Sequence, residues 1–96
     1  MYRLEFSPAA ARYIKKIREK GLKDAFKSAF NALAENPYIG EEKRGDLAGV
    51  YGLDVYYNRT NYEIAYRIYE ESEQTVVVIL AGTRENFYQE LKRYMK

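Results

Sequence analysis

The C-terminal part of the chain holds a cation and a phenol at a spacing that suits work on a phosphodiester. Arg84 and Tyr88 lie four residues apart in the stretch AGTRENFYQELKR (81–93), after the apolar run TVVVIL (75–80). The pattern predicts a buried strand over 75–80 that Gly82-Thr83 ends, and a short helix that Arg84 opens. The two side chains would then share one helix face. An ordinary terminal helix with an exposed arginine and a packed tyrosine is the alternative, because such pairs are common.

Cleaving RNA through its 2′-hydroxyl needs a base, cations that hold the phosphorane charge, and an acid. A guanidinium suits the phosphate, and a phenol works more easily as an acid than as a base. With Tyr57 opposite Tyr62 across a turn, Asp54 lies diagonal to Glu63 and Arg67 on one sheet face. One of the two carboxylates could then be the base, although a solvated charge pair on an open face is the alternative. The candidate catalytic residues are Arg84, Tyr88 and Glu63, and the candidate RNA-binding residues are Arg44, Arg59 and Arg67.

The composition excludes several kinds of site. The 96 residues contain no cysteine and no histidine, so a disulfide framework, a thiolate metal site and the commonest general base are excluded. No metal or other cofactor is expected. The net charge is only +2, but residues 1–30 carry eight Lys/Arg against three Asp/Glu. This basic segment could face an anionic partner, or it could be a solvated helix face.

Length and hydropathy limit the organisation of the chain. A chain of 96 residues is expected to form one domain, residues 1–96, with one core. The N-terminal stretch MYRLEFSPAA lacks the apolar run of a signal peptide, and no segment approaches a membrane span. These features predict a cytoplasmic protein that does not contact a membrane.

The first half of the chain predicts a strand and a helix hairpin. Residues 1–6 alternate and predict a strand, and Ser7-Pro8 has the residue types of a helix N-cap and first helical position. Gly21 is interpreted as the stop of this helix. A second amphipathic helix follows at helical spacing and ends before Pro37. Because Gly21 alone separates the two predicted helices, they are predicted to be antiparallel.

The second half predicts three strands. A loop at 36–46 precedes alternating strands at 50–57 and 62–69, which the turn 58–61 connects, and an acidic turn at 70–74 leads into the apolar strand 75–80. The apolar strand should be central or covered on both faces. The predicted fold class is α+β with the order β-α-α-β-β-β-α. Its small, curved, mainly antiparallel sheet would carry the helix hairpin on one face and a short C-terminal helix.

The order of these elements resembles the RelE/ParE superfamily of toxins from type II toxin–antitoxin modules. The resemblance rests on Arg44-Gly45 before an L-x-G turn (47–49), a tyrosine-rich strand pair, and the closing G-T-R-E-N-F-Y (82–88). It implies a small bacterial toxin that a cognate antitoxin neutralises by wrapping around it, either as a homodimer or as a heterotetramer with the antitoxin. RelE-like members cleave messenger RNA in the ribosomal A site, whereas ParE-like members poison DNA gyrase without cutting RNA.

The resemblance carries over only in part to the site. Arg84 falls where RelE-like toxins keep an arginine after the last strand, and Tyr88 falls near their C-terminal tyrosine at a shorter spacing. Three cations of RelE toxins are absent, because their places hold Gly52, Asp54 and Glu63.

Three hypotheses therefore stay open. The chain is a ribosome-dependent endoribonuclease, a non-nucleolytic toxin that acts on DNA gyrase or another protein target, or a non-toxic binding module of the same fold. Arg84, Tyr88 and Arg44 favour the first hypothesis, and the absence of the RelE lysines at positions 52 and 54 favours the second.

Overall fold

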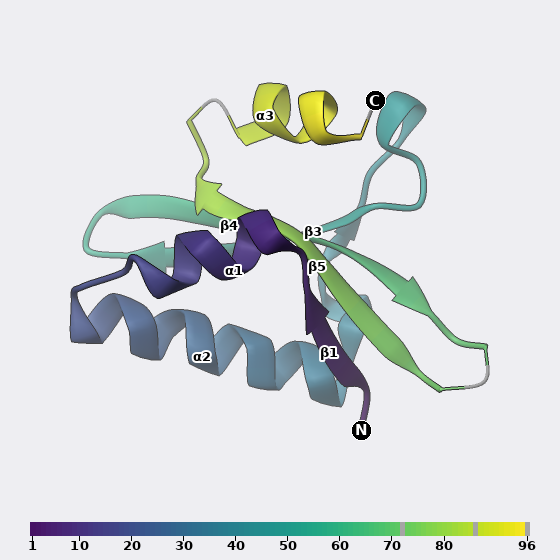
Figure 1. Ribbon diagram of the computed structural model, residues 1–96, viewed down its shortest axis with the longest axis horizontal. Helices are drawn as coiled ribbons and strands as arrows, with labels where there is room; N and C mark the ends of the chain where they lie inside the picture. The colour runs from purple at the N-terminus through teal and green to yellow at the C-terminus, as the bar shows by residue number, and fades with distance from the viewer. Residues whose placement is uncertain (72, 86, 96) are drawn as a thin grey trace.

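The protein is a five-stranded mixed sheet with helices on both faces. A computed structural model describes residues 1–71, 73–85 and 87–95, and Figure 1 shows its arrangement. The sheet order is β1-β5-β4-β3-β2, with β1 parallel to β5 and every other neighbouring pair antiparallel. The strands are β1 (Arg3–Phe6), β2 (Glu41–Glu42), β3 (Tyr51–Tyr57), β4 (Thr60–Tyr69) and β5 (Thr75–Thr83). The helices are α1 (Pro8–Lys15), α2 (Lys20–Glu35) and α3 (Phe87–Tyr94), with short 3₁₀ turns η1 (Pro37–Ile39) and η2 (Gly45–Leu47).

This architecture confirms the predicted fold class. The helices α1 and α2 cover one face of the sheet, and α3 lies on the opposite side, beyond the C-terminal end of β5 (Figure 1). The apolar strand β5 lies between β1 and β4, as its composition predicts. The short strand β2 lies inside the stretch that the sequence predicts as a loop. It could not be predicted, because its two glutamates show no alternation of apolar and polar residues. None of the described helices is both long enough and apolar enough to cross a membrane.

The start of α1 agrees with the sequence, but the end of α1 does not. Ser7 is the N-cap and its Oγ accepts a hydrogen bond from the Ala10 N–H at 3.1 Å. The predicted helix stop at Gly21 is wrong, because Gly21 lies in the first turn of α2. A Cβ at Gly21 would overlap the Tyr57 hydroxyl of β3. Gly21 therefore allows α2 to approach the sheet closely and does not cap α1.

The β3–β4 connection is a two-residue turn. Asn58 and Arg59 both have positive φ, at 51° and 64°, which is the conformation of a tight hairpin turn. Tyr57 pairs with Thr60, so the predicted pairing of Tyr57 with Tyr62 is wrong by two residues. Because side chains alternate with a period of two, this shift leaves every side chain on its predicted face. It places Asp54 directly opposite Glu63 instead of diagonal to it.

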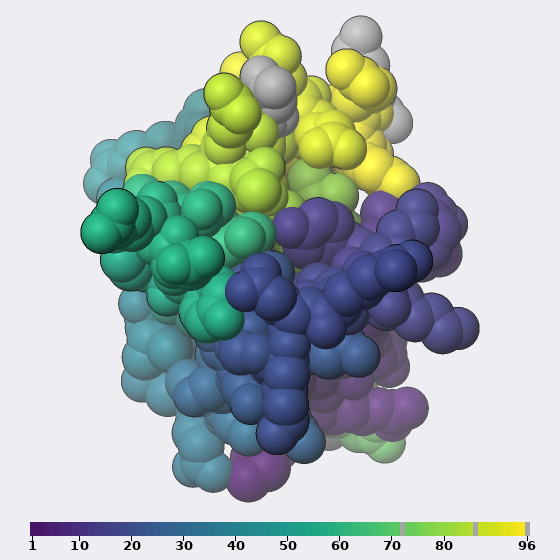
Figure 2. Space-filling view, turned by 90° about the vertical axis from the view of Figure 1, so that its left-hand side faces the viewer, coloured from purple at the N-terminus to yellow at the C-terminus, as the bar shows by residue number. Residues whose placement is uncertain are grey.

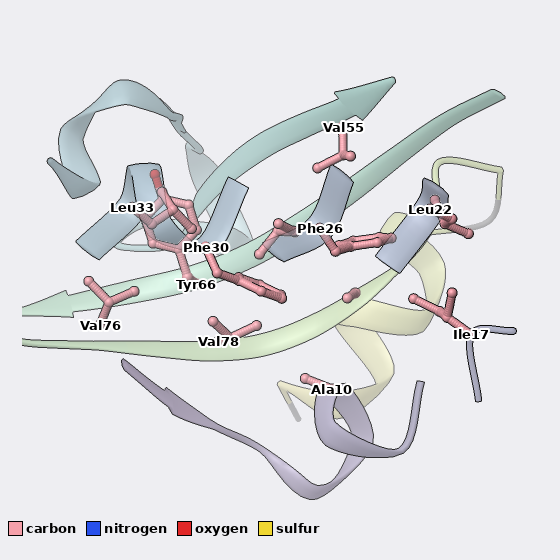
Figure 3. Packing of buried hydrophobic residues seen from close by; sticks show 12 residues of the cluster. Ala10, Ile17, Leu22, Phe26, Phe30, Leu33, Val55, Tyr66, Val76 and Val78 are labelled. Carbon is pink, nitrogen blue, oxygen red and sulfur yellow. The ribbon is translucent and has the colours of Figure 1, made fainter. Parts of the chain in front are cut away.

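Two apolar clusters lie on the two faces of the sheet. The larger cluster fills the space between the sheet and helices α1 and α2, where aromatic rings of α2 pack against valines of β5 (Figure 3). The smaller cluster lies under α3; its buried members are Leu47, Val50, Ala65, Leu80, Phe87 and Leu91. Glu63 is the one charged side chain that is buried among the described residues. It points to the face that α3 covers, since Asp54, Ala65 and Gly82 share its side of the sheet.

The segment after β5 differs from the prediction that Arg84 opens a helix. Arg84 lies in a bend between β5 and α3, and α3 begins at Phe87. Two backbone hydrogen bonds fix this bend, from the Arg84 N–H to the Asn61 carbonyl at 2.9 Å and from the Phe87 N–H to the Arg84 carbonyl at 3.1 Å. The prediction that Arg84 and Tyr88 share one helix face is therefore wrong. The bend nevertheless directs both side chains to Glu63.

Candidate functional site

A buried carboxylate lies at the centre of the candidate site. Glu63 has 1% of its surface exposed, and the Tyr88 hydroxyl donates a short hydrogen bond to its Oε2. Its other oxygen, Oε1, is buried and has no hydrogen-bond partner among the described residues. Buried polar atoms are nearly always hydrogen-bonded. The free oxygen therefore marks Glu63 as a group whose place is not explained by packing alone.

The ammonium group of Lys43 lies next to the same carboxylate, that of Glu63. Its Nζ lies 3.5 Å from Glu63 Oε2 and 3.1 Å from Glu41 Oε1, and it is 5.0 Å from the centre of the Tyr88 ring. The Lys43 side chain is 17% exposed. The backbone of Lys43 is held by a hydrogen bond to the Val50 carbonyl at 2.8 Å. Sequence analysis missed this residue.

Gly52 leaves the space in which Glu63 and Lys43 meet. A Cβ at Gly52 would overlap Glu63 Oε2 and would lie 2.8 Å from Lys43 Cε. A glycine inside a strand often marks the close approach of another group. Gly52 was therefore the sequence signal that could have revealed a second side chain at this point of β3.

Arg84 forms the accessible part of the cluster. Its Nη1 lies 3.6 Å from Asp54 Oδ2 and its Nε lies 3.9 Å from Glu63 Oε1. Both distances are long for ion pairs, and the Arg84 side chain is 52% exposed. Asp54 and Glu63 are like charges directly opposite each other, an arrangement that is unfavourable without cations nearby. Arg84 therefore offsets this repulsion while its guanidinium stays open to solvent.

The surroundings keep Lys43 charged and Tyr88 protonated. Burial of the Lys43 ammonium works to lower its pKa, but the Tyr88 hydroxyl and the carboxylates of Glu41 and Glu63 outweigh burial and raise it. Burial and the hydrogen bond to Glu63 raise the pKa of the Tyr88 phenol above its usual value. At neutral pH the site thus holds a lysine cation and a neutral phenol.

The structure brings together three of the six residues predicted from the sequence. Tyr88 and Arg84 both reach the Glu63 carboxylate, Tyr88 by a hydrogen bond to Oε2 and Arg84 with its Nε at 3.9 Å from Oε1. Arg44 is exposed at the start of η2, where it lines a shallow pocket together with Lys43.

The other two arginines lie away from the buried carboxylate. Arg59 is exposed at the tip of the β3–β4 hairpin, roughly 10 Å along the strand from Glu63. Figure 2 shows this hairpin in green at the surface, between the C-terminal segment in yellow and the helices in blue. Arg67 shares the face of Glu63 but lies beyond Ala65, and its Nη1 is 3.1 Å from the position of a Cβ at Gly49. Of the two predicted clamps, Arg84 therefore lies next to the Glu63 carboxylate, and Arg67 lies farther along β4.

The charges of the cluster nearly cancel. Two cations, Lys43 and Arg84, lie within 4.0 Å of three carboxylates, those of Glu41, Asp54 and Glu63. No group of three or more acidic side chains placed to hold a metal ion occurs among the described residues. The cluster can accept a proton through Tyr88 and Glu63 and can bind an oxyanion through Arg84.

Comparison with known proteins gives a consistent set of similarities. A family model for the ParE-like toxin of type II bacterial toxin–antitoxin systems matches residues 4–92. A chain of the toxin–antitoxin complex RelBE2 from Mycobacterium tuberculosis is 30% identical at a TM-score of 0.67, over 86% of this chain and 98% of that chain. The isolated RelE toxin of E. coli is 22% identical at a TM-score of 0.70, over 97% of this chain and 98% of that chain. A RelE mutant in complex with an antitoxin RelBc peptide has a TM-score of 0.68 at 22% identity, over 94% and 93% of the two chains. No curated protein sequence matches the chain significantly.

Proposed function

Because the chain belongs to the ParE-like toxins of type II bacterial toxin–antitoxin systems, we propose that it arrests growth by cleaving messenger RNA on the ribosome. The observation that carries this proposal is that a tyrosine hydroxyl and an arginine meet at a buried carboxylate, one oxygen of which accepts no hydrogen bond from the described residues. These groups supply a proton acceptor and a phosphate ligand without a metal. The protein would act in the cytoplasm, where messages are translated.

The proposed reaction is attack of a 2′-hydroxyl on the adjacent phosphorus. Glu63 is too buried to contact the RNA, so Tyr88 takes the 2′-hydroxyl proton while its own proton passes to Glu63. The O2′–P bond forms and the P–O5′ bond breaks, which gives a 2′,3′-cyclic phosphate. The leaving O5′ takes a proton from a solvent water. Arg84 holds the non-bridging oxygens, whose charge grows in the transition state. Arg44 and Arg59, both exposed, would contact the RNA outside the reacting phosphate.

One observation favours a second candidate function. The cluster carries two cations against three carboxylates, which suits a nucleic acid backbone poorly. The alternative is a toxin that binds a protein target such as DNA gyrase and cuts no RNA. The site residues would then contact that protein target.

Induction of the protein should arrest bacterial growth, and co-expression of its antitoxin should restore growth. The expectation follows from the family and from its solved relatives, two of which are structures of toxin–antitoxin complexes. The measurement is colony count and incorporation of labelled amino acid after induction. Under the ribonuclease proposal, amino-acid incorporation falls first, whereas a gyrase poison causes DNA damage first. Unchanged growth and translation in several hosts would contradict the proposed toxin activity altogether.

The antitoxin should bind the basic helix pair, in a groove between α1, α2 and β1. The groove has an apolar floor that includes Ile14, Phe26 and Phe30, and it is lined by Lys15, Lys23 and Lys27. An acidic amphipathic segment complements such a surface. We therefore propose that the antitoxin binds this groove and the part of the sheet that the helices leave open.

Antitoxin affinity should fall as ionic strength rises, because the lysines of the groove are exposed. Lys15→Gln should weaken binding about two- to five-fold at low salt and flatten the salt dependence. Lys16→Gln is the matched control, since Lys16 is the next residue and does not line the groove. Titration calorimetry at several salt concentrations measures both effects. A dissociation constant that does not change with salt would argue against an electrostatic contribution.

A further inference from the structure

We propose that Lys43 is a catalytic residue, a cation that contacts the reacting phosphate, and that Gly52 exists to admit it. The proposal rests on the proposed ribonuclease function and adds a residue to it. The strand β3 itself contains no lysine. The structure provides an ammonium at that point of β3 from a different segment, the loop between β2 and η2.

The absence of a side chain at Gly52 leaves space beside β3. The missing side chain of Gly52 leaves room for Glu63 Oε2, and Lys43 Nζ lies 3.2 Å from the position of the absent Cβ. A side chain at residue 52 and the Lys43 ammonium therefore compete for the same volume. The end of the Lys43 side chain thus occupies the space next to the Cβ position of residue 52.

The contacts of Lys43 carry the second step. Its ammonium is fixed between two carboxylates, with Glu41 Oε1 at 3.1 Å and Glu63 Oε2 at 3.5 Å, beside the Tyr88 ring. A lysine held on both sides lies in one position before substrate arrives, which is what stabilisation of a transition state requires. Because burial of Lys43 is incomplete, at 17% exposure, an oxyanion can still reach it.

The position of Lys43 between two other cations carries the third step. On one side Lys43 lines the shallow pocket that also contains Arg44, and on the other it shares Glu63 with Arg84. A phosphate next to Tyr88 would meet Lys43 and Arg84 from opposite sides of the Glu63 carboxylate. Lys43 keeps its proton throughout and only holds charge.

Lys43→Gln tests the proposal, because glutamine removes the charge and still offers an N–H to Glu63. Cleavage of a message on purified ribosomes should slow about 100-fold in kcat, as for a lost oxyanion ligand, with KM changed less than about threefold. Lys43→Arg should keep at least about a tenth of the wild-type rate, because it keeps the charge. Lys92→Gln on α3 is the matched control and should cleave at the wild-type rate. Rates are expressed per folded molecule, measured by circular dichroism.

Gly52→Ala is the second test, since it keeps every functional group and only fills the space that Lys43 and Glu63 use. It should also lower kcat. Folded Lys43→Gln or folded Gly52→Ala protein that cleaves within about threefold of wild type would overturn the role of Lys43. If the wild-type protein itself leaves messages intact on ribosomes, the proposed function fails first. The two failures are therefore distinguishable.

Discussion

Arg84→Ala should lower the rate of messenger cleavage by about 10²- to 10³-fold and should leave the fold intact. A removed ligand of a developing oxyanion typically reduces kcat by this factor, which corresponds to about 2.7–4 kcal/mol of transition-state stabilisation. The fold should survive because the Arg84 side chain is 52% exposed and its ion pairs with described residues are long, at 3.6 and 3.9 Å. The hydrogen bonds that hold the bend at residue 84 use backbone atoms, which alanine keeps.

The measurement is single-turnover cleavage on programmed ribosomes, together with thermal unfolding of the purified variant. Arg93→Ala is the matched control, because Arg93 is an exposed arginine of α3 outside the cluster. It should cleave as the wild type does. A folded Arg84→Ala protein with wild-type cleavage would remove the core of the site. A variant that no longer cleaves but still arrests growth would indicate a target other than RNA.

The order of elements could be predicted because its signals are local. Ser7-Pro8 has the residue types of a helix start, apolar and polar residues alternate along β3 and β4, and β5 is mainly apolar. Each of these elements can therefore be recognised from a few consecutive residues. Gly21 misled the prediction because a glycine can serve two purposes. A helix end and a close approach of the backbone both favour it, and only the tertiary contact with Tyr57 separates the two cases.

In the β3–β4 hairpin the predicted turn is wrong, but the predicted face of each side chain is correct. The segment NRTN (58–61) predicts a four-residue turn, whereas the turn is Asn58-Arg59 alone. The error is two residues, and side chains repeat every two residues. The sequence therefore predicts correctly that Glu63 and Asp54 share one face of the sheet, but it does not predict their direct pairing.

Lys43 could not be predicted as part of the site, because it lies in an irregular loop. Neither helical nor strand periodicity fixes where a loop side chain points. Its contact with Glu63 depends on how β2 pairs with β3 and on the space left by Gly52. The burial of Glu63 was likewise hidden, since it results from α3 and the loop covering one end of the sheet.

Cleavage should occur only in translated messages, and free RNA should stay intact. The cluster brings two cations against three carboxylates, so the isolated protein lacks the positive field that would hold a phosphate chain. Its proton acceptor is a phenol with a raised pKa in contact with a buried carboxylate, which suits a substrate that is already aligned. A ribosome presents the message in a fixed, bent state, and such alignment supplies the entropic part of catalysis.

Mapping RNA 5′ ends after induction, with and without a block of translation, tests this dependence. We expect cuts within coding regions that vanish when initiation is blocked, and no cuts in a purified transcript mixed with the protein alone. Cuts that persist under the block would mean a free ribonuclease, which contradicts the charge argument. Growth arrest without cuts in either condition would assign the cluster to a protein target instead. In that case Arg84→Ala should weaken the arrest by weakening binding, and its effect would appear in affinity for the target and not in any cleavage rate.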